Sequence, residues 1–581
     1  MADKLGNRYE GRWVAYQLLL LIDERIHSVT IEAIGDDEHG VDLWIQQNDG
    51  TREAHQCKAR NGSKEYWSVT DLSNRGVLQN LKSQLSRDPS YKFIFVSSLE
   101  SRTFADMCES SRRINDDPKL FYKVKIEQAG QDVQKCFYNF CKALILDPSN
   151  EDELRKVFNY LKRTYIWSHS DDEGAYKYLM ERISYLLVGA SEETTLSVLL
   201  TYAENKNRFG SPIYADELRN YLIQQNIHPR RLDQDTRIVP AIQVLQNQFE
   251  ESIKPYLISG ITIKRLETDR LVQSIEDGKN VILFGAAGYG KTGVLFELTE
   301  YLKQKCVPYL PIRLDRRQPE NTAAQFGKNM GLPDCPAFSL AGMSGGRPSV
   351  LILDQLDAVR WTSVHSNNAL DVCKELVRHI QFLQRDGKKI TVVLSCRTFD
   401  LEHDPSIKNW LADNKQKVFD KIEVKELPSD KVKELVGPIF MQMTTKEKSL
   451  IACPQNLAIW MELRRAGTAP SFQTATGLMR EFWKDRRTKL TNEAHITSEQ
   501  IDQMLSVLIR YIESNGKISV PERIVLSWPN VIDAFCSYGI LQKNSRMINF
   551  CHQRYLDHLI ANNLLEQIDV GTGNVLDWLG T

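Results

Sequence analysis

The chain has 581 residues, several times the roughly 100–200 residues of a typical domain, so we expect three or four domains. Its 74 Lys and Arg residues nearly balance 75 Asp and Glu residues, so no overall charge indicates a nucleic-acid partner or a disordered acidic chain. A hydrophobic content of 42% and a charged content of 26% are those of an ordinary globular protein, which excludes collagen-like and low-complexity classes.

The first residues predict neither a membrane span nor a secretory signal. The longest apolar run near the N-terminus, Leu18 to Ile22, is far shorter than the ~20 residues of a spanning helix. Eleven cysteines occur without a C-x-x-C pair, a pattern that favours reduced thiols over disulfides or a zinc cluster. We therefore expect a cytoplasmic protein with no structural metal and no membrane partner.

In chain order, residues 1–130 predict a mixed α/β core. Apolar residues at helical spacing predict a first helix over 13–26, and the turn Asn48-Asp49-Gly50 predicts a hairpin. The predicted strands are 28–34, 41–47, 53–59 and 91–97, and a further helix is predicted over 76–85. The pattern then becomes helical with few strand signals, and residues 131–239 are interpreted as a helical extension and linker.

A second α/β pattern covers residues 240–405. Its apolar runs are far enough apart for crossover helices, as a parallel doubly wound sheet requires. The predicted strands are 280–284, 309–314, 349–353 and 389–395. Beyond Asp404 the strand signals fade. Residues 406–467 predict a helical lid, and residues 468–581, with β-like pieces at 516–520 and 546–550, are compatible with a winged helix.

The strongest motif is a complete G-x-x-x-x-G-K-[ST] sequence between a predicted strand and a helical run. Its glycines let backbone N–H groups surround phosphates, its lysine reaches the β- and γ-oxygens, and its threonine binds Mg²⁺. A glycine-rich turn with a coincidental lysine is the plainer alternative, and the flanking strand and helix disfavour it. The candidate residues are Gly285, Gly288, Gly290, Lys291 and Thr292.

Two further strand ends supply groups to the same candidate site. The apolar run Val350–Leu353 ends in Asp354, which is expected to hold Mg²⁺ directly or through water. Asp357 could polarise the attacking water, although a helix N-cap is an equally good interpretation. The strand 389–395 leads to Arg397, which could sense the γ-phosphate at the carboxyl edge of the sheet; a surface salt bridge is its alternative.

The N-terminal hairpin carries a second group of polar residues. Asp42 lies early in one predicted strand, and strand alternation puts Gln56 and Lys58 on the same face of the next. A carboxylate and a second oxygen ligand can hold Mg²⁺ against a scissile phosphate, while a lysine orients or deprotonates the attacking water. Glu32, on the preceding predicted strand, could add a carboxylate. The plainer alternative is an exposed hairpin with polar faces.

The series GAAGYGKT, LILDQLD, SCRTFDLEHD, CPQNLAIW and FCHQRYLDHLIANNLL resembles the STAND class of signal-transduction ATPases, which includes NACHT proteins. It looks closest to the bacterial antiviral STAND (Avs) proteins. The resemblance implies ATP and ADP as ligands, a lid proline, here Pro454, that touches the adenine, and a winged-helix histidine, here His552, that touches the β-phosphate. Both carry-overs rest on short patterns.

The order helix–β–β–β–helix–β around Asp42 and Gln56-x-Lys58 resembles the PD-(D/E)xK fold. It is similar to the double-stranded DNA endonuclease domains of some CD-NTase-associated effectors and Avs proteins. Gln56 departs from the family, where many members carry Asp or Glu, so metal binding would lean on Asp42 and Glu32. The nearest candidates for DNA phosphate contacts are Lys64, Arg75, Lys82 and Lys92, each of which could equally be a solvated surface residue.

Together these resemblances imply an antiphage effector in which ATP controls assembly of an Mg²⁺-dependent nuclease. Its partners would be double-stranded DNA, further copies of the chain in a homo-oligomer, expected to be a tetramer, and a phage protein trigger. Avs proteins capture that trigger with a C-terminal helical-repeat sensor, whereas this sequence ends at Thr581. Two alternatives remain open: an ATP-dependent restriction or translocating nuclease, and a regulatory ATP- and DNA-binding protein with an inactive nuclease domain.

Overall fold

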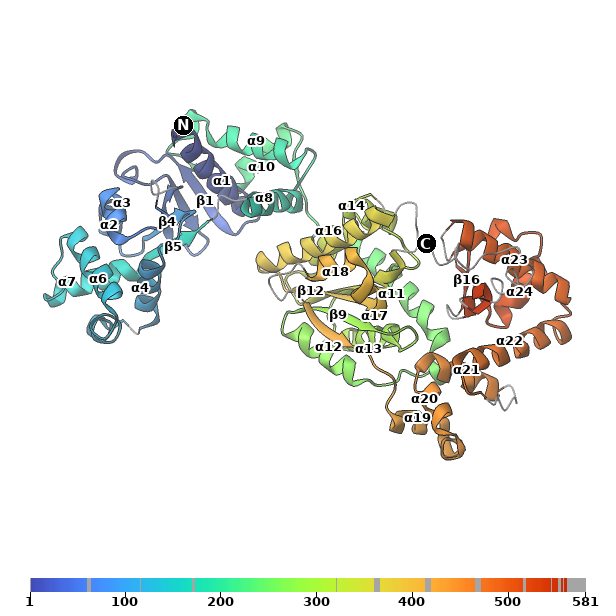
Figure 1. The fold of residues 1–581 in the computed structure, drawn as a ribbon. Coiled ribbons are helices and arrows are strands. Elements are labelled where there is room, and N and C mark those ends of the chain that lie inside the picture. The colour runs from blue at the N-terminus through green and yellow to red at the C-terminus, as the bar shows by residue number, and fades with distance from the viewer. Residues whose placement is uncertain are drawn as a thin grey trace. The chain divides into compact units, whose positions relative to one another are not determined.

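The chain folds as two units, residues 1–231 and 232–581. Figure 1 shows the computed structural model. The described residues are 2–59, 64–114, 116–169, 173–319, 321–359, 366–412, 419–465, 472–515, 519–544, 546–551, 555–556 and 558–561. Within these ranges, no helix is both long and apolar enough to cross a membrane.

The first unit is built on a six-stranded mixed sheet in the order β5-β4-β3-β2-β1-β7. β1, β2 and β3 are antiparallel neighbours, β4 and β5 join them in parallel, and β7 pairs antiparallel with β1. The strands are β1 (Ile26–Ile31), β2 (Leu43–Gln47), β3 (Arg52–Lys58), β4 (Lys92–Ser97), β5 (Thr164–Ser168) and β7 (Pro212–Ile213); β6 (Leu187–Val188) and β8 (His228–Pro229) form a separate pair.

Helices cover both faces of this sheet, because alternate strand residues point to opposite sides. Leu43 and Cys57 pack in one hydrophobic cluster with α1, α8, α9 and α10, whereas Trp44 and Ala54 pack in another with the remaining helices. The helices are α1 (Ala2–Ile22), α2 (Val69–Asn74), α3 (Val77–Leu85), α4 (Arg102–Arg113), α5 (Pro118–Phe121), α6 (Gln131–Leu144), α7 (Glu151–Lys162), α8 (Glu173–Leu186), α9 (Glu192–Ala203) and α10 (Ala215–Gln224).

This arrangement differs from the sequence-based expectations in two places. The first helix ends at Ile22 rather than at residue 26, because the chain turns next, with Glu24 in the left-handed region (φ 57°). β5 and β7 arise inside residues 131–239, for which the sequence predicts a separate helical linker. These strands have five and two residues, and their pairing partners are distant in the sequence, so the local pattern indicates them only weakly.

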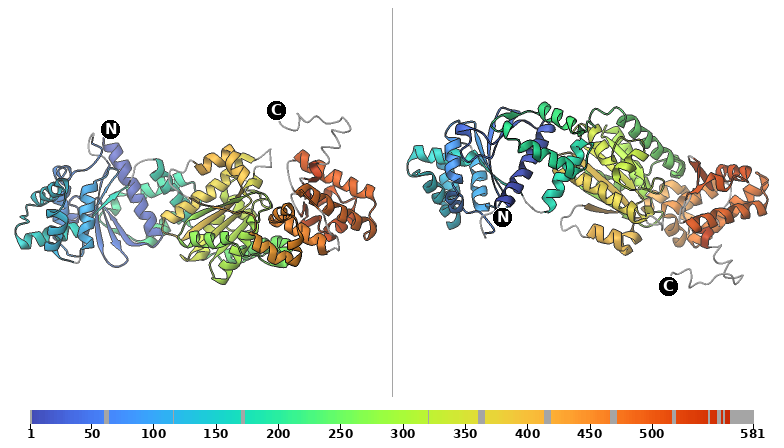
Figure 2. Two further views of the ribbon diagram at one scale, coloured as in Figure 1. Left: turned by 60° about the horizontal axis from the view of Figure 1, so that its bottom comes forward. Right: turned by 90° about the horizontal axis from the view of Figure 1, so that it is seen from above.

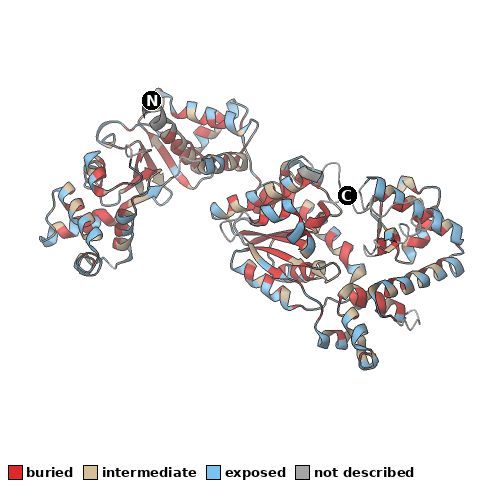
Figure 3. Ribbon diagram, viewed as in Figure 1, coloured by how far each residue is buried: buried red, intermediate tan, exposed pale blue. Residues whose placement is uncertain are grey.

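The second unit contains a five-stranded parallel sheet in the order β10-β11-β12-β9-β13. Helix α13 packs on one face and α16 on the other (Figure 2). The central strands are buried on both faces (Figure 3), and every residue of β11 is buried, as expected for parallel strands between helical layers. The strands are β9 (Asn280–Gly285), β10 (Tyr309–Arg313), β11 (Ser349–Asp354), β12 (Ile390–Arg397) and β13 (Phe419–Glu423).

The parallel sheet predicted from four apolar runs is therefore confirmed, and it has one strand more. β13 lies within residues 406–467, where the sequence predicts only a helical lid. Its sequence, FDKIE, buries only Ile422 and so lacks an apolar run. The helices around the sheet are α11 (Ile238–Ile253), α12 (Leu266–Glu276), α13 (Lys291–Gln304), α14 (Ala323–Asn329), α15 (Pro336–Ser344), α16 (Ser366–Arg385), α17 (Thr398–His403) and α18 (Pro405–Ala412).

The remaining chain forms a helical segment and a small antiparallel sheet that share one hydrophobic core. This core joins Trp460 of the expected lid to Phe482 and Tyr555 of the expected winged helix. We call residues 427–561, which contain these elements and most of this core, the C-terminal module. Its elements are α19 (Ser429–Val436), α20 (Thr445–Ile451), α21 (Pro454–Arg465), α22 (Ala475–Asn492), α23 (Ser498–Asn515), α24 (Pro529–Ser537), β14 (Val520–Pro521), β15 (Leu541–Asn544) and β16 (Met547–Phe550).

Gly327 tests the packing of α14 against the chain that leads into α15. A Cβ atom added at Gly327 in α14 would lie 1.9 Å from the backbone oxygen of Asp334, and a backbone atom cannot move aside as a flexible side chain can. Gly327→Ala is expected to lower the free energy of unfolding by about 1–3 kcal/mol. Gly293→Ala is the control, because nothing lies within 4 Å of its added Cβ. Thermal unfolding at equal temperatures for both variants would contradict this packing.

Candidate functional site

The G-x-x-x-x-G-K-[ST] sequence forms the loop between β9 and α13, as the motif requires. Gly288 and Gly290 have left-handed φ values of 83° and 89°, which side chains with a Cβ rarely adopt. α13 begins at Lys291, so the loop ends at a helix N-terminus, where free N–H groups favour a phosphate. Residues Gly285 to Thr292 are therefore shaped as a phosphate-binding loop.

The beginning of α21 in the C-terminal module lies directly against this loop. The backbone N–H of Gln455 donates to the carbonyl oxygen of Gly288 at 3.2 Å. A Cβ added at Gly288 would lie 2.6 Å from Gln455 Oε1, and one added at Gly290 would lie 3.5 Å from Pro454 Cγ. Pro454, carried over from the STAND resemblance, is thus placed beside the phosphate loop.

Lys291, Thr292 and Asp354 meet at the carboxyl end of the sheet. Lys291 Nζ donates to the carbonyl oxygens of Gly285 and Ala286, at 2.8 and 3.2 Å, and burial lowers the pKa of this ammonium. Thr292 Oγ1 donates to Asp354 Oδ2 at 3.0 Å. Asp354 is fully buried, and burial raises the pKa of its carboxyl group. A buried carboxylate beside a hydroxyl is the donor set that suits Mg²⁺ at a nucleotide.

Asp357 and Arg397 form an ion pair at the same edge. Arg397 Nε lies 2.8 Å from Asp357 Oδ2. Burial raises the pKa of Asp357, and the positive charges of Arg397 and Lys291 oppose that rise. Its other oxygen, Oδ1, is buried and has no hydrogen-bond partner among the described residues.

These groups line a cavity of about 380 Å³, within the usual range for small-ligand sites. Its wall contains both cationic and apolar residues, a combination that suits a phosphate chain attached to a base. The cationic residues are Arg265, Lys291, Arg313, Arg316 and Arg397. The apolar residues are Ile253, Leu257, Ile258, Ile261, Ile263, Leu427, Pro454, Ala458, Phe550 and Leu556.

The C-terminal module reaches this cavity with a contact that sequence reasoning did not find. Tyr256 Oη donates to Gln542 Oε1 at 2.7 Å, and Arg316 Nη2 donates to the same oxygen at 3.3 Å. All three residues line the cavity, as does Cys551. No local motif marks them, since they meet only in the folded unit. His552, the predicted β-phosphate contact, lies outside the described residues.

In the first unit, the predicted residues occupy neighbouring positions at one end of the sheet. Glu32 N donates to Asp42 O at 3.2 Å, and Asp42 Oδ2 accepts from Cys57 N at 2.6 Å. Asp42 precedes β2 and Glu32 follows β1, so both lie just outside the strands on which they were predicted. Gln56 and Lys58 lie at the end of β3. Cys57, between them, packs in the cluster that contains α1, α8, α9 and α10.

The Gln56 side chain is the least satisfied of these groups. It is 4% exposed, and its Oε1 atom has no hydrogen-bond partner among the described residues. Such an oxygen fits a cation ligand, because an unpaired buried acceptor is otherwise costly. Among the described residues, however, no group of three or more His, Cys, Asp or Glu side chains is arranged to hold a metal.

Glu10 of α1 also belongs to this end of the sheet, and sequence reasoning missed it. Its pKa is raised to about 7 by burial and by the negative charges of Asp42 and Glu32, against the positive charge of Lys58. Burial likewise raises the pKa of Asp42, against the Cys57 hydrogen bond and Lys58. The sequence signal was weak, because Glu10 lies in a helix before the first strand, far along the chain from Asp42 and Lys58.

Most of the candidate DNA-contacting cations are engaged within the protein. Lys64 Nζ pairs with Asp71 at 2.5 Å, Lys82 Nζ donates to Leu144 O at 2.5 Å, and Lys92 Nζ lies 3.5 Å from Glu53. Arg75 is exposed. Three of the four are therefore paired within the protein, and Arg75 has the exposure expected of a solvated surface residue.

No protein-family profile and no curated protein sequence matches the chain. Among solved structures, a Walker-type ATPase of Pyrococcus abyssi is 13% identical, with 52% of this chain and 96% of that chain covered and a TM-score of 0.29. Cdc6p of Pyrobaculum aerophilum is 14% identical, with 54% of this chain and 98% of that chain covered and a TM-score of 0.27. AMPPCP-bound DnaA of Aquifex aeolicus is 13% identical, with 56% of this chain and 95% of that chain covered and a TM-score of 0.26.

The second unit has a P-loop NTPase fold. This statement rests on its own geometry: a parallel sheet, a phosphate loop between β9 and α13, and Asp354, at the end of β11, beside Thr292, with β12 between β11 and β9. We refer to its ligand pocket as the NTPase cavity.

Lys291→Ala is expected to weaken ATP binding at the NTPase cavity at least tenfold, because it removes a charge-assisted hydrogen-bond donor worth about 1.5–3 kcal/mol. Lys303→Ala is the matched control, since this lysine lies on the same helix, is exposed and pairs with Glu250. Calorimetric titration with ATP measures both variants. Equal affinity for the wild type and Lys291→Ala would contradict the assignment of the loop.

The raised pKa of Glu10 predicts that, in the absence of metal, the free energy of unfolding of the first unit depends on pH. Its pKa of about 7 in the folded protein lies above the ordinary glutamate value of 4.5, so the stability that this group contributes is complete below about pH 4.5 and is lost as the pH rises through 7. Glu10→Gln should therefore raise the free energy of unfolding at pH 8 by roughly 1 kcal/mol, allowing for solvent screening, and should have little effect at pH 4.5. Denaturant unfolding in EDTA checks this, and a variant less stable at pH 8 would contradict it.

Proposed function

We propose that this chain is an antiphage effector in which an ATP-regulated STAND-type module controls a Mg²⁺-dependent double-stranded DNA endonuclease. The observation that carries the proposal is the meeting of the phosphate loop, Asp357, Arg397 and the C-terminal module around one cavity. A nucleotide bound there would touch both the part that holds phosphate and the part that could move.

Nucleotide binding is supported by the composition of the cavity wall. The loop N–H groups and Lys291 suit the phosphates, and the apolar residues with Pro454 suit the base. Bound Mg²⁺ would neutralise phosphate charge and would be held by Thr292 and Asp354. Arg397 would turn from Asp357 towards a γ-phosphate, which would leave Asp357 free to polarise water.

Control of the C-terminal module is supported by two contacts. The Gln455 N–H donates to the phosphate loop, and Gln542 accepts from both Tyr256 and Arg316. Because lid and expected winged helix share a core, they would move as one body. A nucleotide can shift the module only through contacts that differ between two arrangements. ATP would favour release and ADP the closed arrangement, with His552 proposed at the β-phosphate.

The nuclease proposal rests on the donor groups at the end of the first sheet. Asp42, Gln56 and Glu32 would hold Mg²⁺, whose role would be to activate water and stabilise charge on the scissile phosphate. Lys58 would orient or deprotonate the attacking water. Release of the C-terminal module would let copies of the chain assemble, as a tetramer in the proposal, and raise the affinity for DNA through avidity. A phage protein would provide the trigger.

A second candidate is a regulatory protein that binds ATP and DNA without cutting. The neutral Gln56 ligand and the absence of a three-carboxylate arrangement among the described residues favour it. A single cleavage assay separates the two candidates.

Plasmid DNA incubated with the protein, Mg²⁺ and ATP should be nicked by the wild type. Lys58→Ala should reduce nicking by at least 100-fold, the order of a lost proton-transfer group. Lys82→Ala is the control, because that ammonium is engaged by the Leu144 carbonyl. Equal nicking by the wild type and Lys58→Ala, or nicking by neither under activating conditions, would remove the nuclease assignment. Steady ATP turnover stimulated by DNA would instead favour a translocating nuclease.

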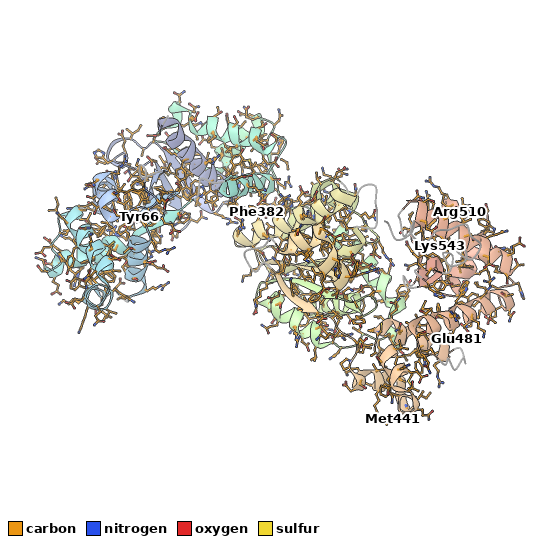
Figure 4. All side chains as sticks on the ribbon, viewed as in Figure 1. Tyr66, Phe382, Met441, Glu481, Arg510 and Lys543 are labelled. Carbon is orange, nitrogen blue, oxygen red and sulfur yellow. The ribbon has the colours of Figure 1, made fainter. Side chains whose placement is uncertain are left out.

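Gln542→Ala should make assembly easier, because it removes the acceptor shared by Tyr256 and Arg316. The variant should reach its oligomeric mass at a several-fold lower ATP concentration, as measured by light scattering. Lys543→Ala is the control on the same strand: Lys543, labelled in Figure 4, pairs with Asp533 and Glu522 within the C-terminal module. Identical ATP dependence of all three proteins would contradict the coupling.

A further inference from the structure

Gln355 occupies an unusual position in the NTPase cavity. It follows Asp354 directly at the end of β11, and it is one of the residues that line the cavity. Its φ is 63°, in the left-handed region. Among the described residues that line the cavity, it is the one non-glycine residue with a positive φ. Non-glycine residues in such conformations concentrate at functional sites.

The backbone of Gln355 is fixed on both sides. Its N–H donates to Ser395 Oγ at 2.8 Å, and its carbonyl oxygen accepts from Ala358 N at 3.0 Å. The same Ser395 hydroxyl donates to Asp354 Oδ1 at 2.5 Å. The position of Gln355 is therefore tied to the carboxylate proposed to hold Mg²⁺, one residue away.

The other candidate for handling water is restrained in this arrangement. Asp357 Oδ2 is occupied by Arg397 at 2.8 Å, so this carboxylate can act only after the ion pair opens. A glutamine amide carries both an acceptor and two donors, so it can orient a water molecule without any change of charge. Glutamine has this role in some P-loop GTPases.

We propose that Gln355 positions the water that attacks ATP in the NTPase cavity. The water oxygen bonds to the γ-phosphorus as the bond from that phosphorus to the β–γ bridging oxygen breaks. ADP leaves with the bridging oxygen, and a water proton passes to a γ-phosphate oxygen, so that phosphate leaves as H₂PO₄⁻. This inference rests on the proposed function only in requiring that the second unit binds ATP.

Two substitutions distinguish the role of the Gln355 side chain from the role of its backbone conformation. Gln355→Gly removes the amide but adopts a positive φ without cost, so the melting temperature should be unchanged or higher. Gln355→Asn keeps a side-chain amide but shortens its reach by one methylene, and asparagine tolerates the left-handed region. Both should lower kcat for ATP hydrolysis at least tenfold and leave KM and the calorimetric affinity for ATP within about twofold of the wild type, which is the signature of a group acting in the transition state.

The control is Asn321→Gly, because Asn321 has a φ of 60° and does not line the cavity. Its kcat should equal that of the wild type. If the wild type binds and hydrolyses ATP and both Gln355 variants keep its kcat, Gln355 is a turn residue and the inference is overturned. Binding by the wild type without turnover overturns it too. If the wild type binds no ATP in the calorimeter, the proposed function fails first, which is a distinct result.

Discussion

The contact between the phosphate loop and the beginning of α21 is the constraint on which the second unit depends. The Gly288 carbonyl accepts the Gln455 N–H, and the absence of a side chain at Gly288 leaves room for the Gln455 side chain. The loop that would hold phosphate is thus also the surface on which the C-terminal module rests. A ligand that reshapes the loop must act on that module, and the reverse is equally true.

The charges in the NTPase cavity are arranged in pairs that a nucleotide could exchange. Arg397 neutralises Asp357, and Arg313 pairs with Asp315 at 2.7 Å. Lys291 is satisfied by loop carbonyls, and Thr292 by Asp354. Arg397, Arg313 and Lys291 each have a partner within the protein, and each could turn to a phosphate at the cost of that partner. In the proposed function, this exchange would be the physical basis for a switch between two arrangements.

The sequence predicts best those features that a local pattern of residues encodes. Four strands of the parallel sheet appear as apolar runs because both of their faces are buried, whereas β13 has only Ile422 buried and gives no such run. The phosphate loop could be located residue by residue, because its chemistry needs a fixed spacing. Glu10, Tyr256 and Gln542 could not, since their roles depend on partners tens to hundreds of residues away.

The central claim is that ATP releases the C-terminal module from the phosphate loop. Hydrogen exchange of the backbone amides in residues 453–457 and 541–551 tests it most directly, because the Gln455 amide bonds to Gly288 in the closed arrangement. The account predicts faster exchange in both segments with a non-hydrolysable ATP analogue than with ADP. Equal protection with the two nucleotides, while both are bound, would contradict it.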